Sequence, residues 1–141
     1  RILPADERNN GLTFKHDRFS KSKKNVLRGL HYDDKTWKLV SCLHGKIYLV
    51  VLDLRPKQPN YGKWETFILS PETSTQVLIP PMFANGHYVF EDDSIFHYKM
   101  AYNGEFNDVD KQKTIRWDSN QFKIDWPCNN PIISKRDANG N

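Results

Sequence analysis

Residues 47–52 read IYLVVL, a run in which apolar side chains follow one another without alternation. A strand with one face in water alternates apolar and polar residues, whereas a strand buried on both faces is apolar throughout. The run is therefore typical of a strand inside a double-layered sheet. A turn dipeptide, His44-Gly45, precedes it, and a segment with two prolines, residues 56–62, follows it. Both are signals that end strands.

Further short apolar or alternating runs recur on both sides of this strand, at the spacing of about 8–12 residues that a sandwich or barrel produces. Helical periodicity is scarce. Residues 1–24 are polar and basic, residues 103–141 are rich in loop signals, and no strand is expected in either. The sequence predicts an all-β fold, an antiparallel double-stranded β-helix (jelly roll) of the cupin type. The expected strands are Asn25–Tyr32, Trp37–His44, Lys46–Arg55, Lys63–Ser70, Thr75–Ile79, Gly86–Glu91 and Ser94–Tyr102.

The composition fits one folded domain. A chain of 141 residues is too short for two ordinary domains, and 38% hydrophobic residues supply one core. No apolar run approaches the roughly 20 residues that cross a bilayer, and no signal-like start is visible. The two cysteines, Cys42 and Cys128, do not make a disulfide framework. We therefore expect a cytoplasmic protein with no membrane partner, in which Cys42 is a small buried hydrophobe.

The histidines give no metal-binding pattern. A metal-binding cupin requires two histidines spaced as HxH, followed by an acid and a later histidine. His31 is followed by Tyr32 and Asp33, so it does not begin such a pair. We therefore expect no metal, and a functional His31 would transfer protons instead. The net charge of +4 favours an anionic ligand only weakly.

Residues 21–31 read KSKKNVLRGLH. This segment resembles the SxSxxxVLRGLHxQ signature of the dTDP-4-dehydrorhamnose 3,5-epimerase family. The resemblance implies one cupin-like epimerase domain, residues 1–141, that is truncated at its N-terminus and lacks the family's first strands. A segment similar to the family's DxRG motif, residues 6–8, lies too close to His31 and is interpreted as a chance match. Further stretches that match family motifs in order are residues 38–40, 53–64, 69–72, 79–86, 98–99, 117–118, 124–127 and 134–137.

What the resemblance implies is a cofactor-free epimerase of a nucleotide-diphospho-4-keto-6-deoxy sugar, working as a homodimer with strand exchange. Such an enzyme removes a proton next to a ketone, holds the enolate and returns a proton on the opposite face. His31 stands at the family's general-base position, with Asp137 as the carboxylate that orients it. Lys38 matches the lysine near the keto oxygen, and Tyr98 matches the general acid. Arg28 matches an arginine that binds the phosphates.

The chain departs from the family pattern mainly at the nucleotide end. His16 and Arg18 replace the glutamine and asparagine that contact thymine, and Asn85 replaces the histidine of the AHGF motif, with His87 two residues later. Tyr102 lies where the family's TxYY segment is altered. These changes resemble the branch that acts on GDP-4-keto-heptoses in capsule biosynthesis. We expect all five residues to bind substrate and a GDP-sugar to be preferred, with the dTDP-4-dehydrorhamnose type next; inversion at C3, C5 or both stays open.

Simple alternation along the strand that holds Arg28 and His31 places these two side chains on opposite faces of the sheet. A β-bulge inserts one extra residue and redirects the side chains that follow it. Glycine within a strand often marks such a bulge. We therefore expect Gly29 to mark a bulge that redirects Arg28 or His31.

Other functions fit the sequence less well. A nucleotide-sugar 3,4-ketoisomerase would use similar histidine and tyrosine residues, but such enzymes lack the tail segments seen here at 124–127 and 134–137. A non-catalytic nucleotide-sugar-binding cupin would be expected to have lost a catalytic residue. A nucleic-acid-binding module is suggested by the lysines within residues 21–24, but the epimerase signature accounts for them, so no nucleic-acid partner is expected.

Overall fold

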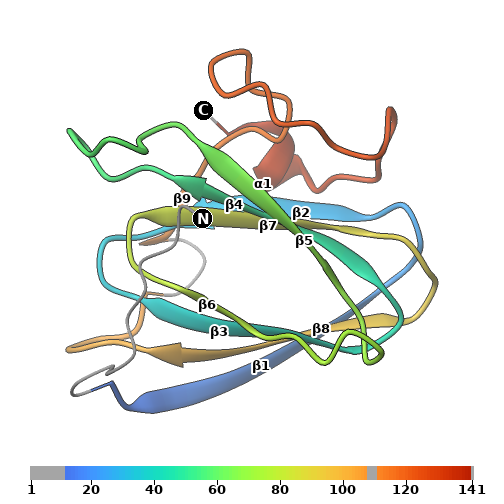
Figure 1. Ribbon diagram of the computed structural model, residues 1–141, viewed down its shortest axis with the longest axis horizontal. Coiled ribbons are helices and arrows are strands. Elements are labelled where there is room, and N and C mark those ends of the chain that lie inside the picture. The colour runs from blue at the N-terminus through green and yellow to red at the C-terminus, as the bar shows by residue number, and fades with distance from the viewer. Residues whose placement is uncertain (1–11, 108–110, 141) are drawn as a thin grey trace.

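Two antiparallel sheets face each other in residues 12–107 and 111–140, the part of the chain that the computed structural model describes (Figure 1). The expected all-β, double-layered architecture is confirmed. The four-stranded sheet has the order β1 (Phe14–Ser22), β8 (Ser94–Ala101), β3 (Trp37–His44), β6 (Val77–Ile79). The five-stranded sheet has the order β5 (Trp64–Leu69), β4 (Ile47–Asp53), β7 (Phe83–Val89), β2 (Leu27–Tyr32), β9 (Lys113–Thr114).

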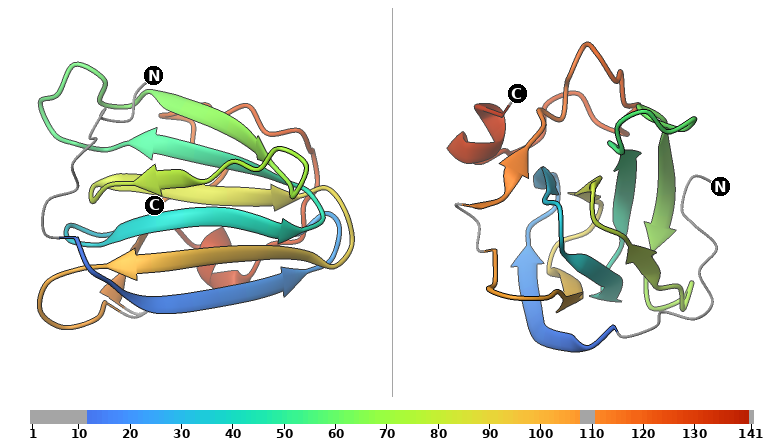
Figure 2. Two further views of the ribbon diagram at one scale, coloured as in Figure 1. Left: turned by 60° about the horizontal axis from the view of Figure 1, so that its bottom comes forward. Right: turned by 90° about the vertical axis from the view of Figure 1, so that its left-hand side faces the viewer.

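Residues 47–52 of β4 are all apolar or aromatic because both faces of the strand are covered. The odd-numbered residues of 47–51 belong to the core between the two sheets. Val50 and Leu52 point to the other side, where they pack in a second core with Phe122 and Trp126. This second core lies under the C-terminal segment, which crosses the outer face of the five-stranded sheet (Figure 2). The prediction of a doubly buried strand is confirmed.

Strand β1 is the main element that the sequence did not predict. It lies within the segment described as polar and pairs with β8 from Phe14 to Ser22. Its pattern is inverted relative to an ordinary half-buried strand: Arg18 and Ser20 line an internal cavity, whereas Phe19 is 66% exposed. The usual signal of apolar residues on the inner face is therefore missing. The expectation of no strand within residues 1–24 is wrong because the inward positions are polar.

Other differences are smaller. Strand β3 has the predicted bounds, whereas β7 begins at Phe83 rather than Gly86. The segment described as loop-rich also contains β9 and a single helical turn, α1 (Lys135–Ala138), which are too short to show a period. Cys42 is buried, as expected. The DxRG-like segment 6–8 lies outside the described residues, and no helix within them is long and apolar enough to cross a bilayer.

The expected bulge at Gly29 is confirmed. Arg28 pairs with His87 of β7 and His31 pairs with Asn85, so three steps along β2 oppose two steps along β7. Gly29 has a φ of +112°, and a Cβ at this position would lie 2.6 Å from the Cα of Gly86. Only glycine fits both the backbone angle and the close approach. The extra residue turns Arg28 and His31 to the same face, toward the interior.

This geometry predicts the effect of a methyl group at the bulge. Gly29→Ala should lower the free energy of unfolding by about 3 kcal/mol, because a strained φ and a backbone clash act together. Gly62→Ala is the matched control: its φ is +84°, but its Cβ would meet only Phe122, at 3.7 Å. This control should cost about 1 kcal/mol. Urea denaturation of both variants measures the difference. Equal losses in the free energy of unfolding would contradict the close approach of Gly29 to Gly86 as the reason for glycine at the bulge.

Candidate active site

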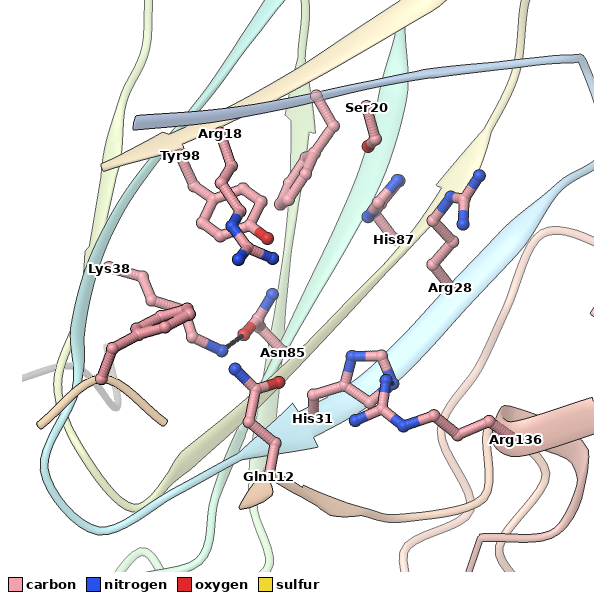
Figure 3. Close-up of a pocket in the computed structure, with 12 residues that line it drawn as sticks. Arg18, Ser20, Arg28, His31, Lys38, Asn85, His87, Tyr98, Gln112 and Arg136 are labelled. Atoms are coloured by element: carbon pink, nitrogen blue, oxygen red, sulfur yellow. Dashed lines mark hydrogen bonds between the residues drawn. The ribbon is translucent and has the colours of Figure 1, made fainter. Parts of the chain in front are cut away.

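A cavity of about 190 Å³ opens between the two sheets. Its wall is built from β1, β2 and β7, together with β3 and β8, so residues far apart in the sequence meet there (Figure 3). Most of the side chains predicted to form a site line this cavity. They are Arg18, Arg28, His31, Lys38, Asn85, His87 and Tyr98.

His31 and Asp137 form a close pair although 106 positions separate them. The His31 Nε2 lies 2.6 Å from the Asp137 Oδ1, and the backbone N–H of Gly29 donates to the Asp137 Oδ2 at 3.1 Å. Asp137 lies behind the ring and is buried, whereas His31 faces the cavity. An ionised carboxylate only accepts hydrogen bonds, so it holds the proton of neutral His31 on Nε2. The unprotonated Nδ1 is then the nitrogen available to abstract a proton.

A helical turn holds the carboxylate in position. Ser134 is the N-cap of α1, and its Oγ accepts a hydrogen bond from the backbone N–H of Asp137 at 3.2 Å. Burial by itself raises the pKa of Asp137, but the hydrogen bonds from His31 and Gly29 and the charge of Arg136 outweigh it. The pKa therefore lies below its ordinary value, and Asp137 is ionised at neutral pH.

Arg136 is a site residue that the sequence did not single out. Its Nη1 lies 3.2 Å from the His31 Nε2. One nitrogen cannot donate to Asp137 and accept from Arg136 at the same time, so the shorter contact with the carboxylate takes the hydrogen bond. The position of Arg136 directly before Asp137, inside a motif, was the available signal.

Four further residues complete the cavity wall without having been predicted. Gln112 and Phe106 come from irregular segments, where no periodicity reveals which side chain points inward. Ser20 comes from the strand that the sequence did not predict. Phe96 has the pattern of an ordinary core residue.

Lys38 reaches the cavity from the sheet opposite to His31. Its Nζ donates to the Asn85 Oδ1 at 2.8 Å, and Asn85 is the residue paired with His31 across β2 and β7. Burial lowers the pKa of Lys38 to about 8; the charge of Asp33 opposes this shift and that of Arg136 adds to it. Lys38 is therefore mainly a cation at pH 7, in the wall of the cavity that His31 also lines.

Tyr98 stands across the cavity from His31 (Figure 3). It belongs to β8 of the four-stranded sheet, directly opposite Arg18 of β1. Its ring packs against the core between the sheets. A planar group bound between the sheets would meet the imidazole on one face and the phenol on the other.

Arg28 and His87 lie next to each other at another part of the wall. They are cross-strand partners, and the Arg28 Nε donates to the Ser22 Oγ at 3.2 Å. Burial, together with the charges of the nearby Arg28 and His31, lowers the pKa of His87 to about 3. His87 is therefore a neutral imidazole at physiological pH.

His16 and Tyr102 do not line the cavity, and neither does Asp137, which lies behind His31. The Tyr102 hydroxyl and the His16 Nδ1 lie 3.0 Å apart. Phe106, which does line the cavity, packs against the His16 ring with 4.6 Å between the ring centroids. The guanidinium of Arg18 lies 5.0 Å from the centre of the Phe106 ring. Together these residues form an aromatic cluster at the border of the cavity.

The charges of the cavity suit an anionic molecule. The lining includes four cationic side chains, Arg18, Arg28, Lys38 and Arg136, and no carboxylate among the described residues. Within residues 12–107 and 111–140, no three histidine, cysteine, aspartate or glutamate side chains lie close enough together to hold a metal ion. A base backed by a carboxylate, a buried ammonium and a phenol can together move protons at a carbon beside a carbonyl group.

Comparisons with known proteins agree with this chemistry. A family model described as dTDP-4-dehydrorhamnose 3,5-epimerase matches residues 5–141. The dTDP-4-dehydrorhamnose 3,5-epimerase of Shigella flexneri is 39% identical over 130 residues, covering 90% of this chain and 70% of that protein. The enzyme of the same description from Methanothermobacter thermautotrophicus is 36% identical over 137 residues, covering 92% and 72%.

Solved structures extend the similarity to the fold. A dTDP-6-deoxy-D-glucose-3,5-epimerase from Legionella pneumophila, in complex with dTDP-4-keto-L-rhamnose, gives a TM-score of 0.86 at 34% identity, covering 99% of this chain and 77% of that chain. A dTDP-4-dehydrorhamnose 3,5-epimerase from Bacillus anthracis with TDP and PPi bound also gives 0.86, at 30% identity, covering 92% and 75%. The predicted cupin-type fold is confirmed. This chain belongs to the dTDP-4-dehydrorhamnose 3,5-epimerase family and is an isomerase.

Proposed function

We propose that the chain is a cofactor-independent epimerase of a nucleotide-diphospho-4-keto-6-deoxy sugar. The observation that carries the proposal is the His31–Asp137 pair, at 2.6 Å, facing Tyr98 across a cavity lined with cations. The cations suit a diphosphate, and the paired acid and base suit proton transfer at a carbon beside a ketone. The Legionella pneumophila relative bound to dTDP-4-keto-L-rhamnose supports a substrate of this class.

Proton removal is assigned to His31. Its Nδ1 takes the proton from a carbon next to the C4 ketone, and the electrons of the C–H bond form the enolate. Asp137 stabilises the imidazolium that results. The Lys38 ammonium, held by Asn85 in the cavity wall, is positioned to stabilise the negative oxygen of the enolate.

Proton return is assigned to Tyr98. Its position across the cavity from His31 supports delivery of a proton to the opposite face of the enolate, which inverts the carbon. The phenolate then regains a proton from solvent.

A GDP-sugar is the proposed substrate, with a dTDP-sugar as the alternative. Arg18, at the edge of the aromatic cluster, carries a planar fork of N–H donors. The guanine edge presents two adjacent acceptors, O6 and N7, which arginine binds in a bidentate manner. The rings of Phe106, His16 and Tyr102 offer stacking surface for a purine.

A homodimer with strand exchange is also proposed, in the cytoplasm. Among the described strands β1 pairs only with β8, so the other side of its backbone can accept a strand from a second copy. Phe19 and Leu43 expose 66% and 49% of their surface, an apolar area that a second copy would cover. Both cysteines are free, which suits a reducing compartment.

Proton NMR in D₂O tests the proposed reaction. The protein is offered GDP- and dTDP-linked 4-keto-6-deoxyhexoses and a GDP-linked 4-keto-heptose. We expect deuterium to enter at C3, C5 or both, with kcat/KM at least about 10-fold higher for a GDP-sugar, the worth of one good hydrogen bond. Movement of the keto group between C3 and C4, or tight binding without exchange, would contradict an epimerase. Preference for the dTDP-sugar would overturn only the nucleotide assignment.

Two variants test the roles within that experiment. His31→Asn should reduce exchange about 10³-fold while nucleotide binding persists, because a general base is lost. Tyr98→Phe should exchange the proton without inverting the carbon. His44→Asn, which changes an exposed histidine outside the cavity, is the matched control and should behave as the wild type. Deuterium exchange at the wild-type rate in His31→Asn would show that His31 is not the general base.

Lys38 predicts an alkaline limit to activity. Because its pKa is about 8, kcat/KM should fall as pH rises through that value and the ammonium is lost. Deprotonation of Lys38 does not itself unfold the protein, since a lysine pKa lowered from 10.5 in the folded state contributes stability that rises with pH between about 8 and 10.5. Lys38→Arg keeps a cation at every pH, so the alkaline limb should vanish even if the rate is lower. A limb that persists in this variant belongs to another group.

The dimer is tested by sedimentation equilibrium. We expect a mass twice that of the 16.6 kDa chain. Phe19→Glu, which places a charge on the exposed apolar area, should shift the protein toward the monomer without loss of β-sheet signal. A wild-type protein with the mass of one chain at micromolar concentration would contradict the proposal.

A further inference from the structure

The ring of His87 contains an unsatisfied polar atom in the wall of the cavity. The residue is 3% exposed, and its Nε2 is enclosed and has no hydrogen-bond partner among the described residues. A buried polar atom without a hydrogen-bond partner lowers the stability of the fold. Such atoms are rare in folded proteins, so each one calls for an explanation. Packing does not explain the imidazole, because its stack on Phe96, with centroids 4.0 Å apart and planes at 14°, would suit a phenylalanine equally well.

The protonation of His87 follows from its surroundings. Burial and the neighbouring Arg28 and His31 keep the ring neutral, so it carries one N–H. Buried N–H groups without a partner are rarer than unpaired acceptors, which favours placing the hydrogen on the other ring nitrogen, Nδ1. His87 lines the cavity and its Nε2 is enclosed, so Nδ1 is the nitrogen that meets the cavity. The ring therefore offers a single neutral donor to a bound molecule.

The register of the sheet says which part of a bound molecule this donor meets. On β7, Asn85 pairs with His31, whereas His87 pairs with Arg28. Residues two apart on a strand are separated by about 7 Å, roughly the span from a sugar ring to its attached phosphate. A sugar held at His31 and Lys38 thus has its nearest phosphate beside Arg28 and His87.

We propose that His87 is a substrate-binding residue whose ring donates a hydrogen bond to an oxygen of the sugar-linked phosphate, next to Arg28. This inference rests on the proposed function, since it concerns the same nucleotide-diphospho sugar. A neutral donor beside arginine adds a directional contact without adding repulsion to a wall that already holds four cations. An imidazole supplies this donor and a phenylalanine does not. The second ring nitrogen of His87 is left unpaired as a consequence.

The test compares the full-length wild type with His87→Phe by isothermal titration calorimetry. The probes are GDP and GMP, or dTDP and dTMP if the thymidine compounds bind the wild type more tightly. We expect His87→Phe to weaken binding of the diphosphate about 10-fold and that of the monophosphate less than 2-fold, because only the diphosphate carries the second phosphate. His87→Gln, which retains an N–H donor, should recover part of the loss.

Thermal unfolding of the same variants separates binding from packing. His87→Phe removes an unpaired buried nitrogen, so its melting temperature should equal or exceed that of the wild type while the diphosphate binds more weakly. If His87 had only a packing role, the substitution would lower both the melting temperature and the affinity for the diphosphate. Tyr88→Phe is the matched control: it removes a hydroxyl on the opposite face of β7 that donates to the Asn25 Oδ1 at 3.0 Å. It should leave both ligands unaffected.

Each other outcome overturns the inference. Unchanged diphosphate binding with a raised KM for the sugar nucleotide would assign His87 to the sugar. Equal weakening of both probes, or a lower melting temperature with weaker binding, would make His87 a packing residue. If the wild type exchanges the sugar protons in D₂O, these results concern His87 alone; if it neither exchanges nor binds a nucleoside diphosphate, the proposed function fails as well.

Discussion

The close approach of Gly29 to Gly86 is the contact on which the cavity depends. At this point two backbones come so near that no side chain fits between them, and β2 gains one residue relative to β7. The gain turns Arg28 and His31 toward the same interior. It also leaves the N–H of Gly29 free of the strand pairing, so that it donates to Asp137. One extra residue therefore sets the direction of the imidazole and helps to hold the carboxylate behind it.

The C-terminal segment connects stability to the site. Its aromatic residues, Phe122 and Trp126, cover the outer face of the five-stranded sheet and close the second core. Backbone hydrogen bonds between Leu30 and Ile115, in both directions, tie the segment to β2. The same segment contains α1, which packs against β2 (Figure 2) and brings Asp137 to His31. Burial of apolar side chains on the outer face of the five-stranded sheet thus fixes the segment that positions the Asp137 carboxylate beside His31, which faces the cavity between the sheets.

Much of the site was predictable because motifs name residues even where periodicity fails. His31, Lys38, Tyr98 and Asp137 were selected from matches to a family signature, and the fold brings His31 together with Asp137. Strand β1 was not predicted, because its inward residues Arg18 and Ser20 are polar and line a cavity instead of packing in the core. Gln112 was not predicted for a different reason: it lies in an irregular segment, where no sequence pattern indicates which side chains point toward the cavity.

The order of residues along the chain was enough to predict the class of the fold and the family. An apolar run with no alternation, IYLVVL at 47–52, specifies a strand covered on both faces, because every residue in it loses water on folding. Ordered motifs specify which chemistry the chain retains. The packing of the two sheets was needed to show which residues face each other and that Arg136 lies against the His31–Asp137 pair. It was also needed to show that the His87 Nε2, in the cavity wall, has no hydrogen-bond partner among the described residues. The physical reason is that these contacts join positions far apart along the chain, so their distances depend on how the sheets pack and not on any local pattern.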